Sequence, residues 1–126
     1  MSGGETRMTA ARLRAFGEAW SRGDVEELMT YMSDDCVYSA SVGPESGRTY
    51  PGREQVRHGF VVMLARDSAG ESQDGPVVVR GQWSSAEWSY VCAQPGGTPV
   101  EVRGCDLFHF RGDKIVEKDA LRKVFG

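Results

Sequence analysis

The residues best suited to acid–base chemistry lie in one predicted strand near the C-terminal end. Asp106 alternates with Phe108 and Phe110, and because successive side chains of a strand point to opposite faces, these three share one face. Apolar surroundings disfavour the charged form of a carboxyl group, which is how an aspartate can donate or accept a proton at neutral pH. Asp106 is therefore the first candidate for a catalytic acid or base, with a solvated aspartate or a structural ion pair as the alternative.

Lys118, on the next predicted strand, is the candidate partner of Asp106. If the connecting turn contains a bulge, Lys118 lies opposite Asp106 and the two form an ion pair. A plain two-residue turn at Gly112 and Asp113 instead sets Asp106 against Asp119, and two carboxylates repel each other. The bulged register is favoured because this turn lacks the Asp-Gly order typical of short hairpin loops.

A second acidic residue, Glu87, precedes Trp88 on the strand expected beside that of Asp106. Only one of the two can share the inner face with Asp106, since a shift of one residue exchanges the faces of a strand. Both arrangements remain open from the sequence.

Histidine and cysteine do not form a recognisable site. His109 alternates away from Asp106 and is expected on the outer face of the sheet, and His58 is expected on a helix surface. The three cysteines are widely spaced and lack a Cys-x-x-Cys pattern, which argues against a disulfide framework and a zinc site. We therefore predict no metal and no organic cofactor.

The elements that must position Asp106 are helices first and strands after them, an order that indicates an α+β fold. Leu13, Phe16 and Trp20 recur at helical spacing, Gly23 ends this helix, and Asp24 can cap the next. A third helix is expected over 53–66, after a loop over 43–52 that covers the surface and before a polar loop over 67–75. Strands are expected at 36–41, 76–82, 85–93, 99–110 and 114–124.

Length and charge limit the possible roles. The chain of 126 residues has room for one domain, which we expect over residues 9–126 after a disordered lead-in over 1–8. Fifteen basic and 18 acidic residues give a net charge of −3, so no basic surface for nucleic acid is expected. No apolar run is long enough to span a membrane and no signal core is recognised, which predicts a cytoplasmic protein.

The order of these elements and their motifs resembles the nuclear transport factor 2-like superfamily. The resemblance rests on Trp20-Ser21-Arg22-Gly23-Asp24, Asp34-Asp35-Cys36-Val37, Gly52, Cys105-Asp106-Leu107-Phe108-His109-Phe110 and Lys114-Ile115. It is closest to the branch of ketosteroid isomerases and SnoaL-like polyketide cyclases. This resemblance implies a cone-shaped, curved antiparallel sheet wrapped around three N-terminal helices and enclosing an apolar pocket.

The catalytic groups of ketosteroid isomerases transfer only in part. The protonated aspartate of that family matches Asp106, whereas its donor tyrosine falls on Phe16, its general base on Ala40 and its supporting tyrosine on Phe60. A phenyl ring cannot donate a hydrogen bond to an enolate, and an alanine cannot carry a proton. Steroid isomerisation by that mechanism is excluded.

The remaining residues predict an apolar pocket for a small hydrophobic or aromatic ligand. Asp106 and Lys118 are its predicted catalytic residues, and its predicted ligand-binding residues are Phe16, Trp20, Tyr38, Phe60, Met63, Trp88 and Phe108. We expect a cofactor-independent isomerase, cyclase or lyase. A non-catalytic ligand-binding protein is the alternative, and the outer sheet face, with Val91, His109 and Val116, is expected to form a homodimer.

Overall fold

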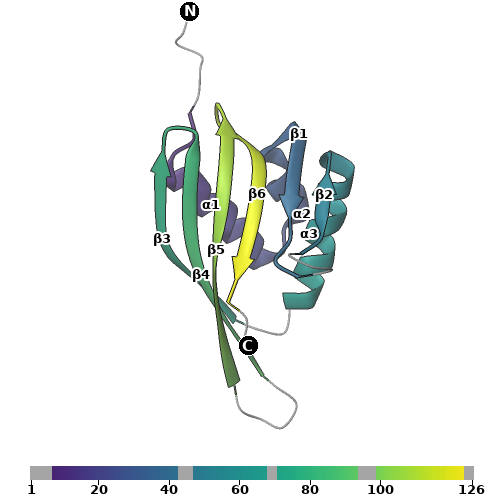
Figure 1. The fold of residues 1–126 in the computed structure, drawn as a ribbon, viewed down its shortest axis with the longest axis vertical. Coiled ribbons are helices and arrows are strands. Elements are labelled where there is room, and N and C mark those ends of the chain that lie inside the picture. Colours follow the sequence, from purple (N-terminus) through teal and green to yellow (C-terminus); the bar gives the residue numbers. More distant parts are fainter. Residues whose placement is uncertain (1–6, 43–46, 68–70, 94–98, 124–126) are drawn as a thin grey trace, which may run out of the picture.

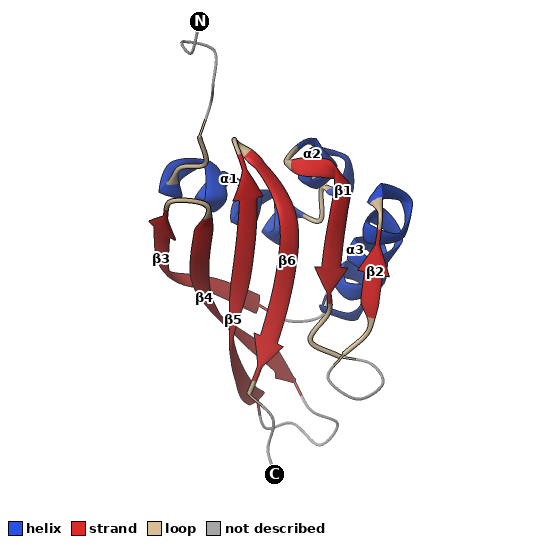
Figure 2. Cartoon of the chain, turned by 45° about the horizontal axis from the view of Figure 1, so that its top comes forward, coloured by secondary structure: helices blue, strands red, loops and turns tan. Residues whose placement is uncertain are grey.

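The computed structural model describes residues 7–42, 47–67, 71–93 and 99–123. Within these ranges, three helices pack on one face of a single six-stranded sheet, as Figure 1 shows. Figure 2 shows how the sheet curves around the helical layer. The elements in chain order are α1 (Ala10–Arg22), α2 (Val25–Thr30), β1 (Met32–Ser39), β2 (Thr49–Pro51), α3 (Arg53–Asp67), β3 (Glu71–Arg80), β4 (Trp83–Ala93), β5 (Pro99–Arg111) and β6 (Lys114–Arg122). The predicted α+β class is confirmed.

The sheet is mostly antiparallel, as predicted, and contains one parallel pair of strands. Its strand order is β2-β1-β6-β5-β4-β3, and β1 runs parallel to β6 while the other neighbours are antiparallel. Strand β2 was missed because its three residues lie in a stretch rich in proline and glycine. Pro51 is compatible with a strand at this position because β2 is an edge of the sheet.

Several predicted boundaries also differ from the structure. Strand β1 begins at Met32 instead of 36 and ends at Ser39 instead of 41. Strand β3 begins at Glu71 instead of 76, so the segment expected as a polar loop is partly a strand. Of the expected lead-in, residues 1–6 lie outside the described part of the chain, but Met8 is buried and its amide donates to the carbonyl of Gly112.

Helix α1 forms where the sequence supplies both end signals. The Oγ1 of Thr9 accepts a hydrogen bond from the amide of Arg12 at 3.0 Å, and Gly23 ends the helix with a left-handed φ of +69°. Between them, Leu13, Phe16 and Ala19 are buried against the sheet. None of the described helices is long and apolar enough to cross a membrane.

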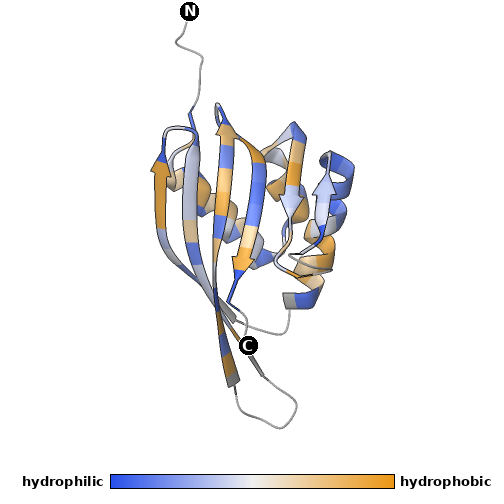
Figure 3. Cartoon of the chain, viewed as in Figure 1, coloured by the Kyte–Doolittle hydropathy of each residue, from blue (hydrophilic) through white to orange (hydrophobic). Residues whose placement is uncertain are grey.

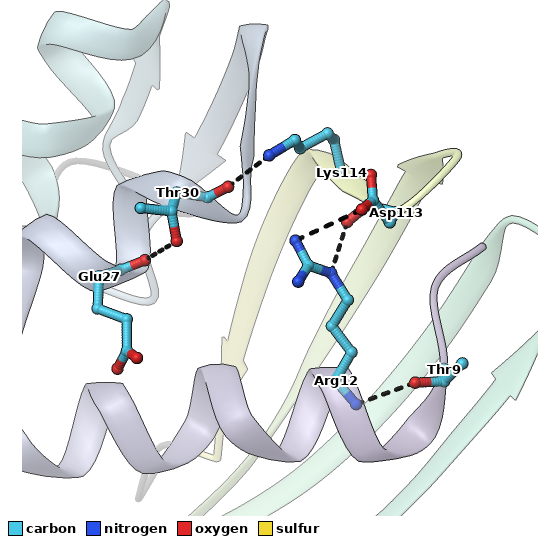
Figure 4. Close-up of polar contacts among 6 residues, drawn as sticks. All are labelled: Thr9, Arg12, Glu27, Thr30, Asp113 and Lys114. Carbon is cyan, nitrogen blue, oxygen red and sulfur yellow. Dashed lines mark hydrogen bonds and ion pairs between the residues drawn. The ribbon is translucent and has the colours of Figure 1, made fainter. Parts of the chain in front are cut away.

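The turn between β5 and β6 is attached to both α1 and α2, as Figure 4 shows. Arg12 Nε donates to the carbonyl oxygen of Asp113 at 2.9 Å, and Lys114 Nζ donates to the carbonyl oxygen of Thr30 at 2.6 Å. The guanidinium of Arg12 also lies 4.4 Å from the ring centroid of Tyr31. These contacts hold the β5–β6 hairpin, which carries both Asp106 and Lys118, against the helices.

The core lies between the helices and the inner face of the sheet. Bands of hydrophobic and hydrophilic residues alternate along β5 in Figure 3, as expected for a strand with one buried face. Phe16 of α1 is at the centre, with its ring edge-on to Tyr31, Phe60 and Phe108 at centroid distances of 5.6, 6.3 and 5.9 Å. Aromatic pairs at such distances contribute beyond the apolar area that they bury.

Candidate active site

A cavity of about 320 Å³ opens between α1 and the inner face of the sheet. Six of the seven predicted ligand-binding residues line it, namely Phe16, Trp20, Tyr38, Met63, Trp88 and Phe108. Phe60 does not line the cavity, which corrects the prediction. Its side chain is fully buried and packs edge-on against the rings of Trp20 and Tyr38 at centroid distances of 5.3 and 4.9 Å, so it supports the wall from behind.

Asp106 and Lys118 meet in this cavity, at a register that neither sequence alternative contained. Asp106 lies opposite Ala120, and Lys118 lies opposite Phe108. The ladder shifts between His109 and Phe110, where β6 contains one extra residue, a bulge. Lys118 reaches Asp106 diagonally instead of directly, with 3.3 Å between Nζ and Oδ2.

The ammonium group of Lys118 is enclosed by aromatic rings. The residue is only 3% exposed, and its Nζ lies 4.4 Å from the ring centroid of Trp20 and 4.9 Å from that of Tyr38. The electron-rich faces of these rings attract a cation, and the attraction increases when water is excluded. The rings and the carboxylate of Asp106 together stabilise a positive charge at this buried position.

Trp88, and not Glu87, shares the inner face with Asp106. The indole Nε1 of Trp88 donates a hydrogen bond to Asp106 Oδ1 at 3.0 Å, whereas Glu87 is exposed. The indole fits because Gly104 lies opposite Trp88 on β5. A Cβ atom at Gly104 would lie 2.2 Å from Trp88 Cζ2, so any side chain there would displace the ring.

Each oxygen of Asp106 therefore has a partner at the wall of the cavity. Oδ1 accepts from Trp88 and Oδ2 faces Lys118, and the side chain remains 16% exposed, which leaves room for a ligand to approach. The site is suited to accepting a proton from a bound ligand, with the ammonium of Lys118 close enough to stabilise negative charge that develops there.

A second acidic residue, Asp74 of β3, also lines the cavity. Burial raises the pKa of Asp74 above its usual value, and the negative charges of Asp106 and Glu18 raise it further. Asp74 is not predicted from the sequence as a site residue, because it lies in the polar stretch over 67–75 whose pattern predicts a loop. The available signal was Gly17, a glycine inside a helix, since such a position often accommodates a close neighbour.

The histidines and the described thiols lie away from this chemistry. His109 stacks on Trp83 at a centroid distance of 4.2 Å, and His58 is exposed on α3. Neither lines the cavity. Burial raises the pKa of Cys36 and of Cys105, which lowers the fraction of reactive thiolate at neutral pH.

Comparisons with known proteins agree with this architecture. The family model for the SnoaL-like domain matches residues 13–118, and no curated protein matches the chain. An NTF2-like protein of unknown function from Cytophaga hutchinsonii has 16% identity and a TM-score of 0.74, over 90% of this chain and 97% of its own.

Two further solved structures are similar in fold. A putative SnoaL-like polyketide cyclase from Jannaschia sp. CCS1 has 16% identity and a TM-score of 0.70, over 89% of this chain and 85% of its own. The epoxide hydrolase/cyclase-like enzyme SalBIII, which has a role in pyran ring formation in the polyether salinomycin, has 16% identity and a TM-score of 0.71. The match covers 90% of this chain and 89% of SalBIII. The family match over most of the chain, together with the fold, shows that the chain belongs to the SnoaL-like domain family of the NTF2-like superfamily.

Proposed function

We propose that the protein is a cofactor-independent enzyme that moves a proton within a small hydrophobic substrate, as an isomerase, cyclase or lyase. The observation that carries the proposal is the carboxylate of Asp106, held between Lys118 and Trp88 at the wall of an aromatic cavity. A carboxylate held at a cavity wall can approach an acidic C–H or O–H group of a bound ligand directly, which is the geometric requirement for a general base. Asp106 is the proposed general base.

Lys118 has an electrostatic role in this proposal. When Asp106 removes a proton from carbon or oxygen, the substrate acquires negative charge that a nearby cation stabilises. The ammonium is 3.3 Å from the base and is held in place by Trp20 and Tyr38. A fixed cation does not have to reorganise as the charge develops, and this is the main advantage of a preorganised site.

The cavity restricts the substrate to a small molecule with a large apolar part. A volume of about 320 Å³ lies at the lower end of the range for ligand pockets. The sequence resemblance assigns the donor and the base of ketosteroid isomerases to Phe16 and Ala40, which are both buried and apolar, so we propose a chemistry that differs from that of those enzymes. The cyclase and the epoxide hydrolase/cyclase-like protein among the similar folds support ring formation as one possible reaction class.

The proposed base can be tested with 5-nitrobenzisoxazole, an aromatic probe that opens when a base removes its ring C–H proton. We expect the wild-type protein to accelerate this opening and Asp106→Asn to lower kcat/KM by about 100-fold, the lower range for general-base catalysis. The Asp119→Asn variant is the matched control, because Asp119 is a carboxylate on β6 that does not line the cavity. Turnover that is equal in wild type and Asp106→Asn would refute the role of Asp106 and favour non-catalytic ligand binding.

We also propose a homodimer through the outer sheet face. Trp83, Leu107 and Leu121 are 59%, 42% and 49% exposed, and His109 stacks on Trp83. Large exposed apolar side chains on neighbouring strands of one sheet face are typical of protein interfaces. Sedimentation equilibrium should show a dimer that Leu107→Lys converts to monomer, and a wild-type monomer at high protein concentration would contradict the proposal.

A further inference from the structure

Asp74 and Asp106 lie on the two sides of Trp88. The strands β6, β5, β4 and β3 are consecutive neighbours in the sheet. Asp74 lies directly opposite Trp88, and Trp88 donates to Asp106, which faces Lys118. Four polar side chains thus cross four adjacent strands on the wall of one cavity, and directly opposed residues have Cβ atoms about 5 Å apart.

Helix α1 is shaped to admit the carboxyl group of Asp74. A Cβ atom at Gly17 would lie 3.3 Å from Asp74 Oδ2 and 3.6 Å from its Cγ. Glycine inside a helix is about 1 kcal/mol less favourable than alanine, so the absence of a side chain at Gly17 has a cost in stability. The gain is space for a carboxyl group between the helix and β3.

The carboxyl groups of Asp74 and Asp106 have different surroundings, as expected for a catalytic acid and a catalytic base in one site. Asp106 has a cation and a hydrogen-bond donor, whereas the described residues provide Asp74 with neither an ion pair nor a hydrogen bond. Asp74 as a whole is exposed, but the partial burial of its carboxyl group against α1 raises the pKa of that group, and the negative charges of Asp106 and Glu18 add to this. The other charged groups that line the cavity are Arg14 and Arg22 of α1, Glu87 of β4 and Arg122 of β6.

We propose that Asp74 is a second catalytic residue, which donates a proton to an oxygen atom of the substrate while Asp106 removes a proton from its carbon or hydroxyl group. The inference rests on the proposed function, since it needs Asp106 as the base. The substrate class is then a small hydrophobic compound in which an acidic C–H or O–H lies near a carbonyl, epoxide or other acceptor oxygen. Pairs of titratable groups in contrasting environments are typical of such sites.

The proton balance of this step closes without a co-reactant. With a carbonyl acceptor, the electron pair of the broken C–H bond forms a C=C bond and the π pair of the C=O bond moves to the oxygen atom. With an epoxide acceptor, the hydroxyl oxygen that loses its proton forms a new C–O bond to an epoxide carbon while the C–O bond of the epoxide breaks. In both cases the acceptor oxygen takes the proton of Asp74. The step leaves Asp106 protonated and Asp74 ionised. The proton then returns from Asp106 to Asp74 through water that enters the cavity, which restores both residues and leaves an isomerised or ring-closed product.

Two probes with different leaving groups test this assignment. In both benzisoxazole and 5-nitrobenzisoxazole, a base removes the ring C–H proton, the N–O bond breaks, and a nitrile and a phenolate form. The unsubstituted phenolate is more basic, so its formation depends more on a proton donor. We expect Asp74→Asn to lower kcat/KM by about 100-fold for benzisoxazole but by only a few-fold for 5-nitrobenzisoxazole, and Asp106→Asn to lower both.

Gly17→Ala is the second variant. It keeps every carboxyl group of the cavity and favours the helical conformation of α1, but its added methyl group displaces the carboxyl group of Asp74. Gly17→Ala should also lower kcat/KM for benzisoxazole more than for 5-nitrobenzisoxazole, and Asp119→Asn should lower kcat/KM for neither probe. If Asp106→Asn lowers kcat/KM for both probes but Asp74→Asn lowers both equally or neither, the role of Asp74 is overturned and that of Asp106 stands. A wild type without Asp106-dependent turnover would overturn the proposed function, and the role of Asp74 with it.

Discussion

Replacing Lys118 by methionine is expected to lower the free energy of unfolding by about 3 kcal/mol, the lower part of the range for breaking a buried ion pair. Methionine preserves most of the volume of the lysine side chain, so the loss of stability comes from the missing positive charge and not from poorer packing. The variant leaves the carboxylate of Asp106 without its cation in a cavity wall where only 16% of the side chain is exposed. Urea unfolding followed by tryptophan fluorescence measures the change.

Asp106→Asn is the matched control for this prediction. It keeps the shape of the side chain and leaves the ammonium of Lys118 between Trp20 and Tyr38, whose rings still stabilise a cation. The loss should therefore be smaller than for Lys118→Met, and the double variant should be more stable than the sum of the two single losses predicts. A loss below about 1 kcal/mol for Lys118→Met would show that the pair behaves like an exposed surface ion pair.

The approach of Lys118 to Asp106 illustrates how far the sequence alone can lead. Alternation along β5 correctly predicts that Phe108 and Phe110 are buried on the face that Asp106 shares. It does not predict the pairing, because Asp106 lies opposite Ala120 and the bulge lies in β6 instead of the turn. A long, flexible lysine spans the diagonal, so the ion pair forms although the expected register is wrong.

Asp74 shows a different limit of the sequence. Glu71, Ser72, Gln73, Asp74 and Gly75 carry no apolar periodicity, and their strand forms because the backbone of β4 needs a partner. Pairing with a neighbouring strand overrides weak local preference, because strand propensity depends strongly on context. Sequence pattern alone therefore finds the residues of the central strands and misses a functional residue on an edge strand.

Gly104→Ala is expected to destabilise the protein by about 3 kcal/mol, the upper end of the usual cost of overpacking. The added Cβ would lie 2.2 Å from Trp88 Cζ2 and 2.3 Å from the carbonyl oxygen of Leu121. The indole can rotate away, but the carbonyl belongs to the backbone of β6, so the β5–β6 ladder must shift. Thermal unfolding measures the loss, and a change in tryptophan fluorescence reports the displaced indole.

Gly75→Ala is the control for Gly104→Ala. It shows how much of the stability change comes from replacing any glycine in a strand and how much comes from the steric overlap at Gly104. Gly75 also lies in the sheet, but its added Cβ would meet Glu87 at 3.2 to 3.4 Å, a distance that small adjustments relieve. We expect a loss below about 1 kcal/mol there. Because Gly104→Ala also removes the hydrogen bond from Trp88 to Asp106, its turnover of 5-nitrobenzisoxazole should fall while that of Gly75→Ala is retained. Equal stabilities of the two variants would mean that the indole does not occupy the space above Gly104.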